Sequence, residues 1–223
     1  MAAKQSSKGA LAGGPVGDYL QALLRDERLL HAWQSYLQPV SAIRAAAQGR
    51  AEDIASLVAL WPLTLVLGEP LTGKSTLLAY LAHETANRLV LAASDEGITF
   101  PVPILVDAEA CPPDASPETI MAQALEKYGV RAADDATRRW LDDAALLFLV
   151  DQVDRVGAAP CPQWVRKICD VATQPNGRIK AMFAARPEAW PGRAWGLPDI
   201  PTVHLGPLSD EDMSAILSSR LTG

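Results

Sequence analysis

The chain is poor in residues that build disulfide frameworks and zinc sites. It has three cysteines, Cys111, Cys161 and Cys169, and no two of them are spaced as C-x-x-C. An odd number of widely separated cysteines predicts neither a disulfide scaffold nor a zinc site, and it favours a reducing compartment. The three histidines are equally scattered, so no Ser-His-Asp or Cys-His arrangement can be argued from spacing.

Positive charge and long apolar runs are also scarce. The 20 Lys and Arg residues are outnumbered by 26 Asp and Glu residues, and the net charge is −6. This balance speaks against a direct nucleic-acid surface. No apolar stretch approaches the roughly 18 residues that cross a bilayer, and residues 1–17 lack the apolar core of a secretory signal. We therefore expect a cytoplasmic protein without membrane or direct nucleic-acid partners.

Residues 68–75 read Gly-Glu-Pro-Leu-Thr-Gly-Lys-Ser, the G-x-x-x-x-G-K-[ST] pattern of a phosphate-binding loop. A β-rich run precedes it, and apolar residues at helical spacing follow it. In such a loop, backbone N–H groups and the positive end of the next helix surround a polyphosphate. Gly68 and Gly73 permit close backbone approach, Lys74 reaches the terminal phosphates, and the Ser75 hydroxyl binds Mg²⁺. The alternative is a chance glycine turn with a solvated lysine.

Leu71 is the irregular position of this loop. A small residue, usually glycine, would let the backbone curl around phosphate more easily at this point. The sequence therefore predicts nucleotide binding with weakened affinity, while Lys74 and Ser75 are intact.

A second apolar run, Ala144–Val150, ends in Asp151. This pattern predicts a buried parallel strand, neighbouring the first, whose carboxyl end meets the nucleotide. Asp151 would then hold Mg²⁺ through a water. Asp154, three residues on, could position or deprotonate an attacking water. Taken without the phosphate loop, the same run could be a core strand with a capping aspartate.

A third run, Ile179–Ala185, ends in Arg186. An arginine that leaves a parallel strand at the nucleotide edge can neutralise charge on a γ-phosphate. The alternative is a surface arginine in a proline-rich turn.

Together, four motifs resemble the NACHT family of signal-transduction NTPases, in the STAND group of P-loop proteins, and its bacterial branch in particular. The likeness extends over about residues 60–220. Its four motifs are Val66 to Ala82, Leu146 to Asp154, Ala184 to Pro187, and His204 to Asp212.

This resemblance implies an α/β fold, the three-layer P-loop NTPase sandwich with a mostly parallel central sheet. It also implies a conformational switch that binds ATP or ADP with Mg²⁺ and associates with itself or with partner domains of a longer chain. Ser75 and Asp151 would serve the metal, and Lys74, Asp154 and Arg186 would act at the reacting phosphate. The nucleotide-binding residues that the resemblance implies are Gly68, Glu69, Pro70, Leu71, Thr72, Gly73, Lys74, Ser75 and Thr76.

The chain departs from the family pattern in ways that bear on hydrolysis. Leu71 stands where the family has glycine. Arg155 follows Asp154 where a second acid is usual, and Ala184-Ala185 replaces Thr-Ser before Arg186. We expect binding to persist and hydrolysis to be slow or absent, because one candidate water-orienting carboxylate is missing.

The pattern of apolar residues divides the chain into four parts. We expect a flexible tail over 1–17, a helical N-terminal region over 18–60, the P-loop NTPase domain over 61–208, and the start of a truncated helical extension over 209–223. The N-terminal helices could cover the domain or receive a partner.

Three functions remain open from the sequence. The first is a nucleotide-controlled switch in a signalling or defence protein. The second is an interaction scaffold whose nucleotide site has degenerated, as Leu71 and Arg155 would suggest. The third is a small-molecule P-loop kinase, which would need an acceptor pocket and an arginine-rich lid.

Overall fold

The structure is a computed structural model. It describes residues 14–35, 43–45, 61–92, 100–131, 134–156, 160–175 and 177–207, together with residues 210 and 214.

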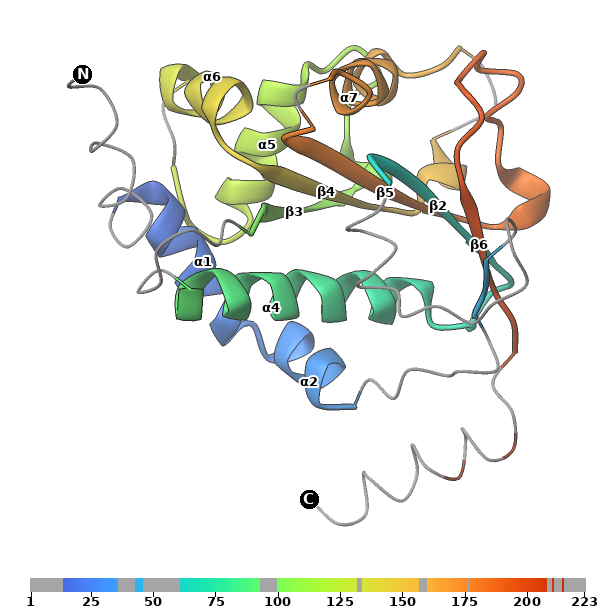
Figure 1. Cartoon of the computed structure of the whole chain (residues 1–223), viewed down its shortest axis with the longest axis horizontal. Helices are drawn as coiled ribbons and strands as arrows, with labels where there is room; N and C mark the ends of the chain where they lie inside the picture. Colours follow the sequence, from blue (N-terminus) through green and yellow to red (C-terminus); the bar gives the residue numbers. More distant parts are fainter. Residues whose placement is uncertain are drawn as a thin grey trace.

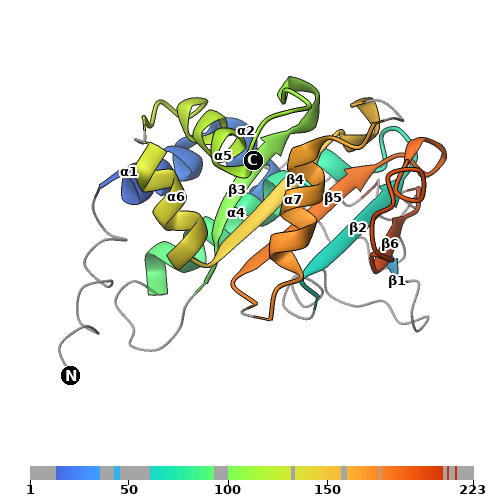
Figure 2. The same cartoon turned by 90° about the horizontal axis from the view of Figure 1, so that it is seen from above.

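A six-stranded sheet forms the centre of the molecule (Figure 2). Five neighbouring strands run parallel in the order β6-β2-β5-β4-β3, and β1 pairs antiparallel with β6 at the edge. This confirms an α/β fold with a mostly parallel sheet. The strands are β1 (Ile43–Ala45), β2 (Leu63–Gly68), β3 (Val102–Asp107), β4 (Leu146–Asp151), β5 (Ile179–Ala185) and β6 (Thr202–Leu205).

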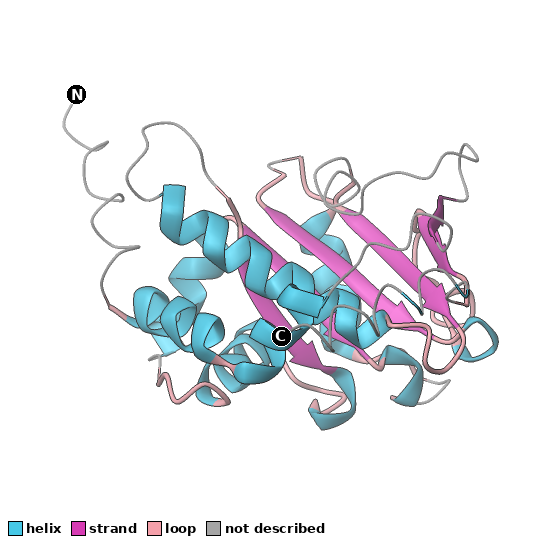
Figure 3. Ribbon diagram, turned by 90° about the horizontal axis from the view of Figure 1, so that it is seen from below, coloured by secondary structure: helices cyan, strands magenta, loops and turns pink. Residues whose placement is uncertain are grey.

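Helices cover both faces of the sheet (Figure 1). On one face α4 crosses the strands, and α1 and α2 pack outside it; Figure 3 views the sheet from this side. On the other face lie α5, α6 and α7. The α-helices are α1 (Pro15–Arg25), α2 (Glu27–Ser35), α4 (Lys74–Ala92), α5 (Pro117–Glu126), α6 (Asp134–Asp143) and α7 (Gln163–Ala172), and the short 3₁₀ helices are η1 (Ala108–Ala110), η2 (Val153–Arg155) and η3 (Pro187–Ala189).

The central strands are mostly apolar and buried because both of their faces are covered. All six residues of β2 are buried, and β4 is buried from Leu146 to Val150. Continuous burial is the expected state of parallel strands between helical layers. The consequence for function is that side chains with polar groups gather where these strands end.

The N-terminal region differs from the sequence expectation in two places. Helix α1 begins at Pro15, inside the segment expected to be a tail, because Val16 is buried against the core. Within the stretch expected to be helical up to residue 60, Ile43–Ala45 is a strand that pairs with β6. The backbone hydrogen bonds of the sheet edge override a weak helical pattern there. The other residues of 36–60 and most of 208–223 lie outside the described residues, although Asp210 and Ser214 are helical.

Helix α2 is fixed to α4 by polar and aromatic contacts. The Trp33 indole Nε1 donates a hydrogen bond of 2.7 Å to Glu84 Oε2, and Arg88 Nε donates one of 2.6 Å to Glu84 Oε1. The Trp33 ring also lies on the ring of buried His83, with centroids 5.0 Å apart. Helix α2 therefore acts as a cover for the helix that follows the phosphate loop.

Among the described residues, no helix combines the length and the apolar character that crossing a membrane requires.

Candidate functional site

The G-x-x-x-x-G-K-[ST] segment connects the end of β2 to the beginning of α4, as the sequence predicts. Strand β2 ends at Gly68, and α4 starts at Lys74. Its first turn is closed by a hydrogen bond of 2.8 Å from the Leu77 N–H to the Gly73 carbonyl. The free N–H groups of this helix end face the loop, which is the arrangement that favours an anion.

Lys74 is directed back over the loop. Its ammonium Nζ donates hydrogen bonds to the carbonyl oxygens of Gly68, at 2.6 Å, and of Glu69, at 2.8 Å. The Thr72 hydroxyl donates to the same Glu69 carbonyl at 2.9 Å. The positive charge is thus held at the mouth of the loop, where a phosphate would meet it.

Gly68 is a position where only glycine fits. A Cβ atom placed on it would collide with the Thr72 hydroxyl and come within 3.0 Å of the Leu205 carbonyl oxygen. The loop therefore begins in close contact with β6, and its first residue cannot carry a side chain without displacing the backbone.

The two backbone positions that curve the loop are Leu71, with a φ of 68°, and Gly73, with a φ of 88°. Glycine adopts such angles without cost, whereas a leucine is strained there. The Leu71 side chain is 98% exposed, so no packing offsets the strain. The sequence expectation that glycine suits this position better is therefore confirmed by the backbone.

Asp151 ends β4 at the same edge of the sheet, but its strand is not a direct neighbour of β2. Strand β5 lies between them, pairing with β2 through Leu67 and Ala185 and with β4 through Val150 and Phe183. The expectation of adjacent strands was wrong because strand order depends on helical crossovers that local sequence does not encode. The Asp151 carboxylate accepts a hydrogen bond of 2.9 Å from the Gln152 N–H.

Because β5 separates the two strands, Arg186 leaves the sheet between the phosphate loop and Asp151. Its guanidinium Nε donates a hydrogen bond of 2.6 Å to Asp154 Oδ2, an atom on the turn after β4. The Asp154 side chain is only 6% exposed, while that of Arg186 is 42% exposed. Two residues expected to act on a triphosphate are thus paired with each other.

Arg155, which stands where the resemblance led us to expect an acid, turns away from this pair. Its Nη1 donates a hydrogen bond of 2.9 Å to Glu109 Oε2 on η1, and both side chains are more than half exposed. Sequence reasoning missed Glu109, since an exposed acid two residues beyond a strand carries no motif. Arg155 therefore supplies no group that could orient a water beside Asp154.

Electrostatics link these residues to Lys74. Burial lowers the pKa of Lys74, and the negative charges of Asp154 and Asp151 oppose that decrease. The nearby positive charge of Arg186 lowers it further. The hydrogen bond and the charge of Asp154 in turn raise the pKa of Arg186 above its ordinary value. The loop lysine, two aspartates and an arginine thus belong to one electrostatic environment at the end of the sheet.

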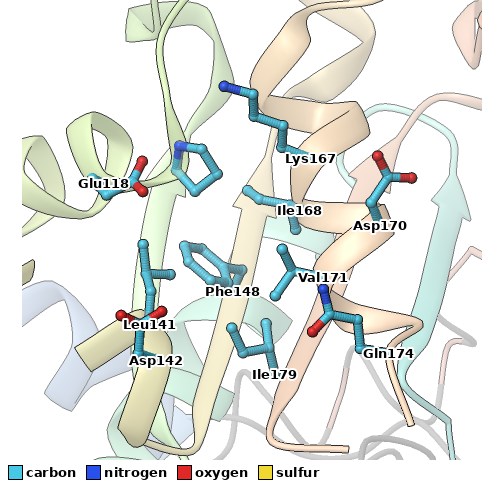
Figure 4. Close-up of a pocket in the computed structure, with 11 residues that line it drawn as sticks. Glu118, Leu141, Asp142, Phe148, Lys167, Ile168, Asp170, Val171, Gln174 and Ile179 are labelled. Atoms are coloured by element: carbon cyan, nitrogen blue, oxygen red, sulfur yellow. The ribbon is translucent and has the colours of Figure 1, made fainter. Parts of the chain in front are cut away.

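A separate cleft of about 430 Å³ opens between α6 and α7 (Figure 4). Its floor is apolar and includes Phe148 and Ile179, and Glu118, Asp142 and Lys167 stand around its rim. No residue of the predicted nucleotide site lines it. It is therefore separate from the predicted phosphate site.

Another cleft, of about 680 Å³, is floored by Leu65 and Leu67 on the surface of β2. Strand register places these residues on the same face of the sheet as Phe148, because Leu63 and Phe148 both pair with Ala181. Trp190 and Arg193 stand in its wall. Helix α4 lies on the opposite face, and none of residues 68–76 lines this cleft, so it does not contain the phosphate-binding groups.

The residues at the loop fit a nucleotide phosphate with its magnesium ion. A lysine held over loop carbonyls, a left-handed turn at Gly73 and an exposed helix N-terminus are the features such a group needs. Ser75 and Asp151 are one hydroxyl and one carboxylate, and Mg²⁺ commonly takes its remaining ligands from phosphate and water. Within the described part of the chain, no three His, Cys, Asp or Glu side chains gather as ligands of a metal.

Comparison of the sequence with protein-family models and with curated proteins gave no match.

Proposed function

We propose that this protein is the nucleotide-binding module of a NACHT-like STAND switch and that it binds ATP or ADP with Mg²⁺ at residues 68–76. The observation that carries the proposal is the hydrogen-bonded loop between β2 and α4, with Lys74 over the carbonyls of Gly68 and Glu69. Three further charged groups lie at the same end of the sheet. The proposal also takes the fold to be a P-loop NTPase sandwich.

In this proposal each residue has a physical role. Loop N–H groups and the start of α4 bind phosphate oxygens, and Lys74 exchanges its carbonyl partners for them. Ser75 and Asp151 hold the metal ion, which neutralises phosphate charge when it is bound. Arg186 reaches the third phosphate of a triphosphate.

Slow or absent hydrolysis is part of the proposal. Asp154 would have to orient an attacking water alone, because Arg155 stands where the resemblance implies a second acid and is paired with Glu109 instead. Nucleotide binding would therefore shift the conformation or the self-association of the protein, with little acceleration of hydrolysis.

Calorimetric titration with ATP, ADP and GTP in the presence of Mg²⁺ tests the proposal. Lys74→Ala should abolish triphosphate binding, because the flexible ammonium over the phosphates is lost. Lys127→Ala is a matched control, since this lysine caps the exposed end of α5. Unchanged affinity of the Lys74 variant would mean that the loop has been misinterpreted.

Two alternatives have distinct outcomes in the same experiment. Absence of binding by the wild-type chain would favour the degenerate scaffold, to which the strained Leu71 points. Transfer of phosphate to a small-molecule acceptor would favour the kinase. Steady turnover at about 1 to 100 per second would contradict a slow switch.

A further inference from the structure

The contact between Arg186 and Asp154 joins two residues that sequence reasoning assigned to separate tasks. The two side chains come from different strand ends, 32 residues apart in the chain. Their hydrogen bond of 2.6 Å uses the Nε–H of the guanidinium and one oxygen of a carboxylate that is almost fully buried. Such charge-assisted bonds are short and are stronger than neutral ones.

We propose that Asp154 is a positioning residue that restrains Arg186 and thereby sets how strongly the site prefers triphosphate over diphosphate. This inference rests on the proposed nucleotide-binding function. The bond holds the Nε–H of Arg186 on the buried carboxylate, and in this inference the arginine must leave that position to contact a third phosphate. A diphosphate makes no such demand, so the restraint weakens binding of one nucleotide and not of the other.

The unequal burial of the two partners gives the restraint its direction. Asp154 is 6% exposed and sits on the turn formed by η2, whereas the Arg186 side chain is 42% exposed on the segment that leaves β5. A long, half-exposed arginine has room to swing to a ligand, while the buried carboxylate stays in place. Arg186 is therefore the moving partner, and Glu188, at 3.9 Å, is its nearest other acid.

The amount by which triphosphate binding is weakened depends on the fraction of molecules in which Arg186 is not bonded to Asp154. Apparent affinity falls in proportion to the fraction of molecules in the competent state, so an arginine free about one tenth of the time weakens binding about tenfold. Solvent competes for the exposed guanidinium, which makes a larger factor implausible. Asp154→Asn keeps the shape of the side chain and removes the charge that holds Arg186. We expect this variant to raise the ratio of ATP to ADP affinity by about three- to tenfold.

The test is calorimetric titration of the full chain with ATP·Mg²⁺ and ADP·Mg²⁺ for wild type, Asp154→Asn, Arg186→Gln and the double variant. Glu109→Gln is the matched control, because it breaks the neighbouring Arg155 ion pair and removes one negative charge without touching Arg186. The expected result is a raised ratio in Asp154→Asn alone. In the Arg186→Gln background, Asp154→Asn should leave the ratio unchanged.

Each other outcome overturns the inference in a recognisable way. If wild type binds both nucleotides and Asp154→Asn leaves the ratio unchanged, Asp154 does not restrain Arg186, and the proposed function stands. If the ratio of ATP to ADP affinity rose equally in Glu109→Gln or in the double variant, the effect would come from the loss of a negative charge and not from Arg186. If wild type binds neither nucleotide, both the function and the inference fail.

A spectroscopic measurement leaves Asp154 in place and so avoids any variant that folds poorly. The Nε–H signal of Arg186, assigned by its loss in Arg186→Lys, should be protected from exchange in the free protein because it is hydrogen-bonded. ATP·Mg²⁺ should shift this signal, and ADP·Mg²⁺ should not. The same shift with both nucleotides would contradict discrimination through Arg186.

Discussion

Leu71 adopts a backbone conformation that is strained for a leucine. It adopts a left-handed φ of 68° while its side chain is 98% exposed. A left-handed conformation costs a residue with a Cβ about 1 to 2 kcal/mol. Glycine avoids that cost, but its greater conformational freedom in the unfolded chain lowers the free energy of unfolding by about 0.4 to 1 kcal/mol. We predict that Leu71→Gly increases the free energy of unfolding by about 0.5 to 1 kcal/mol, measured by urea denaturation.

Leu71→Ala is the matched control for this prediction. Alanine removes the exposed side chain but keeps the Cβ atom, so the strain remains. It should therefore be no more stable than wild type. A Leu71→Gly variant less stable than Leu71→Ala would show that the strain is absent in solution.

The sequence predicts some residues of the site much better than the contacts between them. Lys74 and the glycines belong to a motif with fixed spacing, so their position after β2 follows from the pattern. The bond between Asp154 and Arg186 depends on side-chain rotamers and on which strands are neighbours. Neither is encoded by residues close in sequence, and the same reasoning explains why Glu109 was missed.

At the scale of elements, the attachment of α2 to α4 gives a pH-dependent prediction. Burial raises the pKa of Glu84, but the hydrogen bonds from Trp33 and Arg88 outweigh it and hold the pKa below its ordinary value of 4.5. The stabilisation is therefore present above pH 4.5 and is lost as the pH falls through the lower folded-state pKa.

We predict that Trp33→Phe, which keeps a ring on His83 but removes the indole donor, lowers the free energy of unfolding at pH 7 by about 1 to 2 kcal/mol. Denaturation curves at decreasing pH measure the free energy of unfolding of both proteins. The difference between wild type and Trp33→Phe should shrink once Glu84 is protonated in both. A difference that stays constant with pH would attribute the loss to packing rather than to the hydrogen bond.

Long apolar runs made most elements predictable. Strands β4 and β5 lie where their runs predict them, because burial on both faces requires continuous apolar sequence. Strand β1 was not predicted. Three residues with Arg44 at their centre carry no β pattern, and only the partner β6 makes them a strand.

At the scale of the whole molecule, nucleotide binding should appear as increased stability. A ligand that binds only the folded state at 100 times its dissociation constant adds about 2.7 kcal/mol. For a chain of this size each kcal/mol raises the melting temperature by about 2 to 4 °C. We therefore predict a rise of about 5 to 10 °C with ATP·Mg²⁺ in thermal unfolding monitored by fluorescence.

Chelation of Mg²⁺ by EDTA should reduce this rise, since the metal ion neutralises part of the phosphate charge. Lys74→Ala should remove it. An equal rise in the Lys74 variant would mean that ATP stabilises the protein at a place other than the phosphate loop.

The position of β6 has a consequence for how the protein is made. This strand lies between β1 and β2, which come earlier in the chain and do not pair with each other. During synthesis on the ribosome, β2 acquires its first neighbour when β5 emerges, while β1 waits without a partner until residues 202–205 have left the exit tunnel. Nascent chains halted before that point should therefore expose the edge of β2 that the Gly68 turn needs for support, and they should be targets for chaperones.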